Sequence, residues 1–96
     1  MEKIIWSYLA INDLQDIYDY ICKDSELYAL RLTERIVERV EILNTHPTAG
    51  TVVPEFEQEN IRQLIQGNYR IIYRINSDGS IGIARVYHGA RLLSAI

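Results

Sequence analysis

Hydrophobic residues in the N-terminal half of the chain recur at helical spacing. The first stripe, at i, i+3, i+4 and i+7, consists of Leu14, Ile17, Tyr18 and Ile21. The second, with spacings of 3, 4, 4 and 3, consists of Ala29, Leu32, Ile36, Val40 and Leu43. Ser25 can cap the second helix, and Pro47 lies just beyond its end. Because short helices are unstable alone in water, we expect a helical hairpin that packs on another element.

The hydrophobic period changes to two in the C-terminal part of the chain. The alternation predicts three strands, over Ile61–Gln66, Tyr69–Ile75 and Ile81–Tyr87. Gly67-Asn68 is a two-residue hairpin signal with Gly first, as a type II′ turn requires. Residues 76–79 predict a longer turn. The three strands should therefore form an antiparallel meander.

Two further segments complete the predicted fold. β-prone residues predict an N-terminal strand over Lys3–Tyr8, and residues 45–60, which hold both prolines, predict a long loop. The order is that of an α+β fold: an N-terminal strand, a helical hairpin on one face, and a three-stranded antiparallel meander. With 96 residues, 48% of them hydrophobic, the chain should form a single domain spanning 1–96.

Alternation along the middle strand divides its side chains between two faces. The set expected to face the helices consists of Tyr69, Ile71, Tyr73 and Ile75. Arg70 and Arg74 are then expected on the open face. The hairpin turn pairs Ile65 with Arg70, which places Gln63 on the arginine face as well. Arg62 should lie on the other face, near the sheet edge.

Charge is distributed unevenly along a chain whose net charge is −3. Residues 1–60 carry five basic and twelve acidic residues (5 − 12 = −7), whereas residues 61–96 carry five arginines and Asp78 (5 − 1 = +4). The difference indicates two faces with different partners. The overall acidity argues against RNA binding, which draws on positive charge.

Several classes of protein and site are not expected. No apolar run is long enough to span a membrane, and the N-terminus lacks a signal-peptide pattern, so we expect a cytoplasmic protein without a membrane partner. Cys22 has no cysteine partner and should be half-buried packing. No phosphate-binding loop or metal-ligand motif is present, so we expect no cofactor and no metal.

Three motifs together resemble a known family. They are Ile61-Arg62-Gln63-Leu64, Gly67-Asn68-Tyr69-Arg70-Ile71-Ile72-Tyr73-Arg74-Ile75, and Val86-Tyr87-His88-Gly89-Ala90-Arg91. They resemble the RelE/ParE superfamily of toxins from bacterial type II toxin–antitoxin modules, and the resemblance extends over essentially the whole chain. It implies the α+β fold described above and a cognate antitoxin that neutralises the toxin.

The resemblance implies one of two activities. ParE-like members inhibit DNA gyrase and are not enzymes, whereas RelE-like members cut mRNA on the ribosome without a metal. For the second activity Arg70 and Arg91 match two arginine positions, and His88 can serve as acid or base. However, the strand before the hairpin offers Ile61, Gln63 and Ile65, where that branch tends to place lysines or an acid/base group. We therefore favour the ParE-like branch; a member that only binds antitoxin is a third possibility.

The candidate binding residues for target or antitoxin lie in the arginine-rich C-terminal part of the chain. They are Arg70, Arg74, Tyr87, His88 and Arg91. Among the tyrosines, Tyr87 is the candidate for function because it adjoins His88 and Arg91, whereas the others singled out, Tyr18 and the two on the middle strand, are assigned to the core. The alternative role for His88 is to close the last strand.

Overall fold

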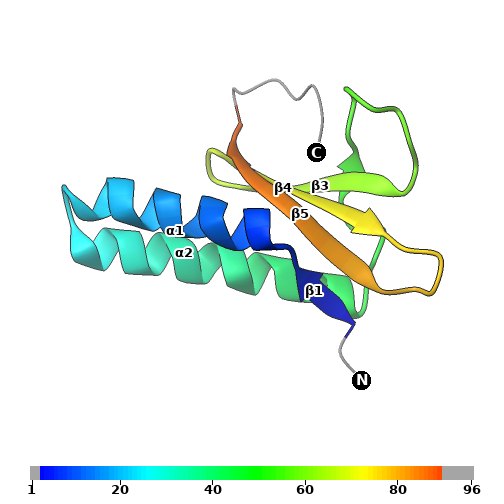
Figure 1. Cartoon of the computed structure of the whole chain (residues 1–96), viewed down its shortest axis with the longest axis horizontal. Coiled ribbons are helices and arrows are strands. Elements are labelled where there is room, and N and C mark those ends of the chain that lie inside the picture. Colours follow the sequence, from blue (N-terminus) through cyan, green and yellow to red (C-terminus); the bar gives the residue numbers. More distant parts are fainter. Residues whose placement is uncertain (1–2, 90–96) are drawn as a thin grey trace.

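A computed structural model describes residues 3–89 of the chain (Figure 1). Its elements are β1 (Ile4–Trp6), α1 (Tyr8–Cys22), α2 (Glu26–Val40), the 3₁₀ helix η1 (Glu41–Asn44), β2 (Thr51–Val52), β3 (Ile61–Gln66), β4 (Tyr69–Ile75) and β5 (Ile81–His88). The described strands form a mixed sheet in the order β1-β5-β4-β3-β2, in which β1 is parallel to β5 and the other neighbours are antiparallel. The predicted α+β fold with its helical hairpin and antiparallel meander is confirmed.

The junction between β1 and α1 lies earlier than the sequence predicted. Ser7 is the N-cap of α1, and its hydroxyl oxygen accepts a hydrogen bond from the Ala10 backbone N–H at 3.0 Å. Tyr8 therefore belongs to the helix, and the prediction of a strand through Tyr8 was wrong. The reason is that a capping side chain satisfies helix N–H groups that have no partner within the helix.

The two helices run side by side against one face of the sheet (Figure 1). The predicted α2 stripe is buried there, where Leu32, Ile36 and Val40 join residues from three strands in the main core. The predicted α1 stripe is only partly buried: Leu14, Ile17 and Ile21 pack against this core, whereas Tyr18, assigned to the core from the sequence, is half-buried outside it. This core consists of Ala10, Leu32, Ile36, Val40, Leu43, Leu64, Ile71, Tyr73, Ile81, Ile83 and Val86. Cys22 is half-buried, as predicted. No helix within residues 3–89 is long and apolar enough to cross a membrane.

The β3–β4 hairpin has the predicted register. Gln66 pairs with Tyr69 and Ile65 pairs with Arg70. Gly67 has φ 58° and Asn68 is not among the residues with positive φ, which fits a type II′ turn, since type I′ requires positive φ at both positions. The hairpin thus places Gln63 on the same face as Arg70.

The face expected to be open is covered at one end. Residues 45–60 do not form only a loop: Thr51–Val52 is β2, which pairs with β3 at the sheet edge. Beyond it, Val53 packs with residues of β3, β4 and β5 in a second cluster, made of Val53, Ile61, Ile72 and Tyr87, with Phe56 packed against it. Arg70 lies on this face but is only 7% exposed, so the prediction that it is open to solvent was wrong.

Tyr73 of β4 holds the segment of residues 45–60, which covers this face, by hydrogen bonds near the sheet edge. Its hydroxyl donates to the Pro47 carbonyl at 2.7 Å and accepts from the Gly50 N–H at 3.0 Å. Gly50 lies so close to β3 and β4 that an added Cβ would meet the Gln63 carbonyl and the Tyr73 ring. Arg62 donates to the Gly50 carbonyl at 3.0 Å, so its guanidinium also holds this segment.

Candidate functional site

The guanidinium of Arg70 is surrounded by side chains from its own chain. Its two terminal nitrogens donate to the two carboxylate oxygens of Glu55, each at 2.9 Å, and its Nε donates to Oε1 of Gln63 at 2.8 Å. The pair is bidentate, which is the strongest geometry for an arginine and a carboxylate. We call these three residues, Glu55, Gln63 and Arg70, the Arg70 cluster.

The Arg70–Glu55 ion pair is largely buried, unlike an ordinary surface salt bridge. The side chain of Arg70 is 8% exposed and that of Glu55 is 18% exposed. The hydrogen bonds that Arg70 donates to Glu55 raise the pKa of Arg70, while desolvation acts in the opposite direction. Arg70 is therefore held as a cation with its charge balanced inside the fold, and any outside anion must compete with Glu55.

A shallow pocket of about 530 Å³ opens beside the Arg70 cluster. It is lined by Pro54, Glu55, Gln63, Ile65, Arg70 and Gly89. Tyr87 pairs with Arg70 across the sheet but is only 6% exposed and belongs to the second cluster. The predicted binding residue Tyr87 thus contributes packing to the second cluster and does not line this pocket.

The structure separates the other predicted residues from this pocket. Arg74 is exposed four residues along β4 from Arg70, a distance of about 13 Å at strand rise. The His88 ring makes an edge-on contact with Tyr69, with ring centroids 5.8 Å apart. Tyr69 packs against the main core, so His88 lies on the helix side of the sheet and Arg70 on the other. Arg91 lies outside the described residues.

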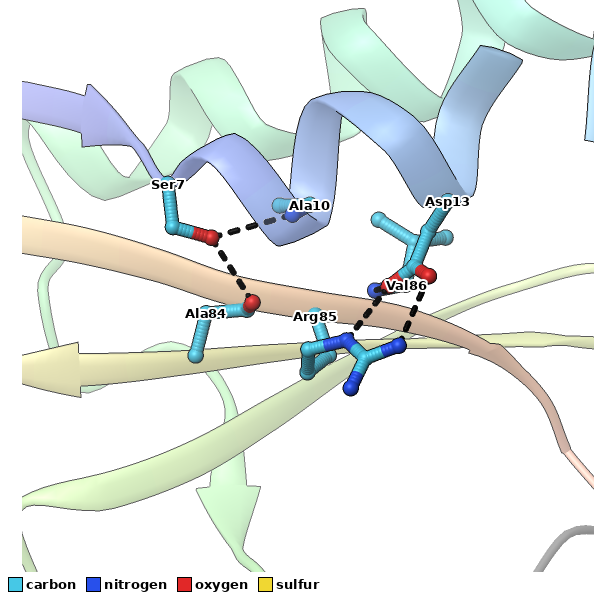
Figure 2. Close-up of polar contacts among 6 residues, drawn as sticks. All are labelled: Ser7, Ala10, Asp13, Ala84, Arg85 and Val86. Carbon is cyan, nitrogen blue, oxygen red and sulfur yellow. Dashed lines mark hydrogen bonds and ion pairs between the residues drawn. The ribbon is translucent and has the colours of Figure 1, made fainter. Parts of the chain in front are cut away.

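A second, partly buried arginine pair, which sequence analysis did not identify, closes the free edge of β5 (Figure 2). Nε of Arg85 donates to Oδ2 of Asp13 at 2.8 Å, and a terminal nitrogen donates to Oδ1 at 2.9 Å. The same carboxylate accepts the Val86 backbone N–H at 2.9 Å, and the Ser7 hydroxyl donates to the Ala84 carbonyl at 2.8 Å. These bonds begin where β1 ends. Beyond that point the side chains of Ser7 and Asp13, rather than a neighbouring strand, bond to the backbone of β5.

Sequence reasoning also missed Glu55, since it fell within a segment predicted as a loop. The available signal was charge: the acidic N-terminal part and the arginine-rich C-terminal part fold together and neutralise each other at both Glu55–Arg70 and Asp13–Arg85. Between residues 3 and 89 no group of three or more His, Cys, Asp or Glu side chains is placed to hold a metal ion.

Comparison with known proteins gives the family. A family model described as the ParE toxin of the type II toxin–antitoxin system, parDE, matches residues 4–93. The toxin named RelE2 from Caulobacter vibrioides is 30% identical over 92 residues, which make up 96% of this chain and 100% of that protein.

Two solved structures share the fold. The chromosomal ParDE system from P. aeruginosa matches with a TM-score of 0.75 and 27% identity, over 92% of this chain and 96% of that one. A YoeB/ParE toxin from Agrobacterium tumefaciens matches with a TM-score of 0.61 over 92% and 98% of the two chains, and at 16% identity it shows the fold alone. The chain therefore belongs to the ParE toxin family of type II toxin–antitoxin systems, within the RelE/ParE superfamily, and this membership implies a cognate antitoxin as its partner.

Proposed function

We propose that this chain is a ParE-like toxin, a single domain spanning residues 1–96, that inhibits DNA gyrase in the cytoplasm. It arrests growth by binding its target without catalysing a reaction, and its antitoxin neutralises it. The observation that carries this proposal is the Arg70 cluster, because the arginine that an RNA-cutting member would present to a phosphate is already bound to Glu55.

A second argument comes from acid/base chemistry. Cleavage of RNA requires groups that move protons close to the group that stabilises the phosphate. His88 lies on the opposite side of the sheet from Arg70, and Glu55, the titratable side chain beside Arg70, has both carboxylate oxygens bound by the guanidinium. His88 and Arg70 are therefore poorly placed to act together on one phosphate.

The alternative is a RelE-like, ribosome-dependent mRNA endoribonuclease that uses Arg70, His88 and Arg91. It is favoured by the name of the relative from Caulobacter vibrioides, Toxin RelE2. A member that only binds its antitoxin is the third candidate.

Two assays with the purified chain separate these candidates. We expect loss of supercoiling by gyrase and intact mRNA in a translating extract. Site-specific mRNA ends with unaffected supercoiling would contradict the proposal and support the alternative, and inactivity in both assays with retained antitoxin binding would support the third candidate.

A pair of variants tests the arginine face. Arg74→Ala removes an exposed guanidinium from the proposed binding face, and Arg31→Ala removes an exposed one from α2. We expect Arg74→Ala to raise the half-inhibitory concentration for gyrase about tenfold, as loss of an important interface residue does, and Arg31→Ala to leave it unchanged. Equal effects of the two variants would argue that the target binds elsewhere.

A further inference from the structure

A pocket of about 320 Å³ lies between α1 and the last residues of β5, and it shares no lining residue with the pocket beside the Arg70 cluster. Four aromatic rings and two carboxylates line it, from Asp13, Asp16, Tyr20, Tyr69, Tyr87 and His88. We call it the tyrosine pocket. We propose that it receives an arginine side chain of the cognate antitoxin that membership of the family implies.

Helical spacing brings the α1 residues of the tyrosine pocket together. Asp13, Asp16 and Tyr20 stand at i, i+3 and i+7, which places them on one flank of the helix. Asp13 accepts the Val86 backbone N–H, so this flank is turned toward β5 (Figure 2). Because β1 pairs with β5 only as far as Ile83, the described neighbour of the last residues of β5 on this side is α1.

The rings of the tyrosine pocket already attract cations of the chain itself. The guanidinium carbon of Arg85 lies 4.6 Å from the centroid of the Tyr87 ring, and Nζ of Lys23 lies 5.8 Å from that of Tyr20. Both distances are within the range in which a ring face attracts a positive charge. A guanidinium is planar and stacks on such faces, so arginine suits these rings better than lysine does.

Asp16 provides the negative charge for an additional cation. The carboxylate of Asp13 is already balanced by Arg85, at 2.8 Å. Asp16 is exposed, and between residues 3 and 89 its carboxylate makes no hydrogen bond or ion pair with another residue. A guanidinium that stacks on the rings could therefore also donate two charge-assisted hydrogen bonds to Asp16.

The charge around the tyrosine pocket indicates the kind of partner. The pocket's carboxylates belong to the N-terminal part of the chain, in which acidic residues exceed basic ones, so nucleic-acid phosphates are repelled. A basic protein segment is attracted. The antitoxin is the protein partner that the family itself implies, whereas the face proposed for gyrase presents Arg74, which has the opposite charge. The inference rests on family membership and does not depend on the action of the chain on gyrase.

The first test asks whether the tyrosine pocket selects a guanidinium. The probes are acetyl-Gly-Arg-Gly-amide and the same peptide with citrulline, which has nearly the same shape but no charge. Ring signals of Tyr20, Tyr69 and His88 follow binding by NMR. We expect a Kd of about a millimolar for the arginine peptide and at least about tenfold weaker binding of the citrulline peptide.

The second test measures the affinity of the purified antitoxin for variants of this chain by calorimetry. Asp16→Asn removes the charge and Tyr20→Leu removes a ring, and we expect each to weaken binding about tenfold, as loss of contacts to an anchoring arginine does. Asp19→Asn removes an exposed carboxylate of α1 that does not line the pocket, and Tyr20→Phe keeps the ring; both should bind as wild type. Asp16, Asp19 and Tyr20 are all exposed, so these variants should fold.

Three results would overturn the proposal. The first is equal binding of the arginine and citrulline peptides. The second is an antitoxin affinity that is the same for Asp16→Asn and Asp19→Asn. The third is an equal loss of antitoxin affinity in Tyr20→Leu and Tyr20→Phe, which would mean that the hydroxyl of Tyr20 rather than its ring makes the contact. Neither test involves gyrase, so failure of the proposed function would leave these results unchanged.

Discussion

The two faces of the sheet are covered in different ways. Among residues 3–89, α1 and α2 bury a main core of eleven residues on one face, whereas on the other a segment of irregular chain buries a cluster of four. Buried apolar area contributes roughly 25 cal/mol per Å², so most of the stabilisation comes from the helix side. The second face holds Arg70 and Glu55, and its cover depends on a few specific contacts. A substitution on this second face can therefore change its charged groups while the main core stays intact.

The two arginine–carboxylate pairs illustrate the same difference. Asp13 binds Arg85 and also accepts the Val86 N–H, so this pair completes the edge of the sheet. Glu55 binds an arginine that also donates to the side chain of Gln63, so among residues 3–89 these contacts join side chains rather than strand backbones. The first pair is tied to strand pairing, whereas the second joins β4 to the segment that covers this face.

The largest effect should come from Gly50→Ala, which acts on the cover of the second face. The new Cβ would collide with the Gln63 carbonyl and approach the Tyr73 ring at 2.8 Å, so we expect a loss of about 3 kcal/mol of unfolding free energy in urea denaturation. Gly82→Ala is the control, since its Cβ would meet only the Asn76 side chain, at 3.9 Å. Equal stability of the two variants would mean that Gly50 does not anchor the segment.

A smaller effect is expected from Asp13→Ala, on the helix side. The change leaves the Arg85 guanidinium and the Val86 N–H without their carboxylate, at a cost of about 2–3 kcal/mol. Asp16→Ala, which removes an exposed carboxylate from the same helix, should stay within about 0.5 kcal/mol of wild type. Thermal unfolding measures both, and a neutral Asp13→Ala would show that the edge of β5 does not need this side chain.

The smallest of the three effects is expected from Tyr73→Phe, which removes the hydroxyl that joins the two faces. Loss of its bonds to Pro47 and Gly50 should cost about 1–2 kcal/mol, whereas Tyr20→Phe, on an exposed tyrosine, should cost nothing measurable.

The same variant should change the alkaline limb of stability. Burial raises the pKa of Tyr73 above the ordinary value of 10.0, so the folded state favours the neutral phenol. This contribution is present below pH 10 and is lost as pH rises through the raised folded-state pKa, because the unfolded chain ionises first. Tyr73→Phe should therefore lose less stability above pH 10 than wild type does. If Tyr73→Phe loses as much stability above pH 10 as wild type does, groups other than Tyr73 cause that loss.

Much of the fold followed from local patterns. The stripe on α2 and the alternation on β4 identified the residues that pack between helices and sheet, and the Gly67-Asn68 turn established the β3–β4 register. These predictions succeeded because periods of 3.6 and 2 are direct consequences of backbone geometry. Recognition of the family rested on motifs in the same strands.

The candidate site was less predictable, because it depends on residues distant in sequence. An irregularity in β5 shows why: Ile72 pairs with Arg85 but Tyr73 pairs with Ile83, so Ala84 is an extra residue. Strict alternation would have placed Arg85 and Tyr87 on the side of Ile83, whereas the bulge brings Val86 into the main core instead.

By itself the sequence determined the helical hairpin, the meander, the face on which Arg70 lies and the excess of arginine in the C-terminal part. The tertiary structure alone decided that Glu55 would close over Arg70, that Asp13 would complete the edge of β5, and that His88 would lie across the sheet from Arg70. The physical reason is that periodicity specifies which side of an element is apolar, whereas the partner of a buried charge is chosen by packing between segments that local sequence does not relate.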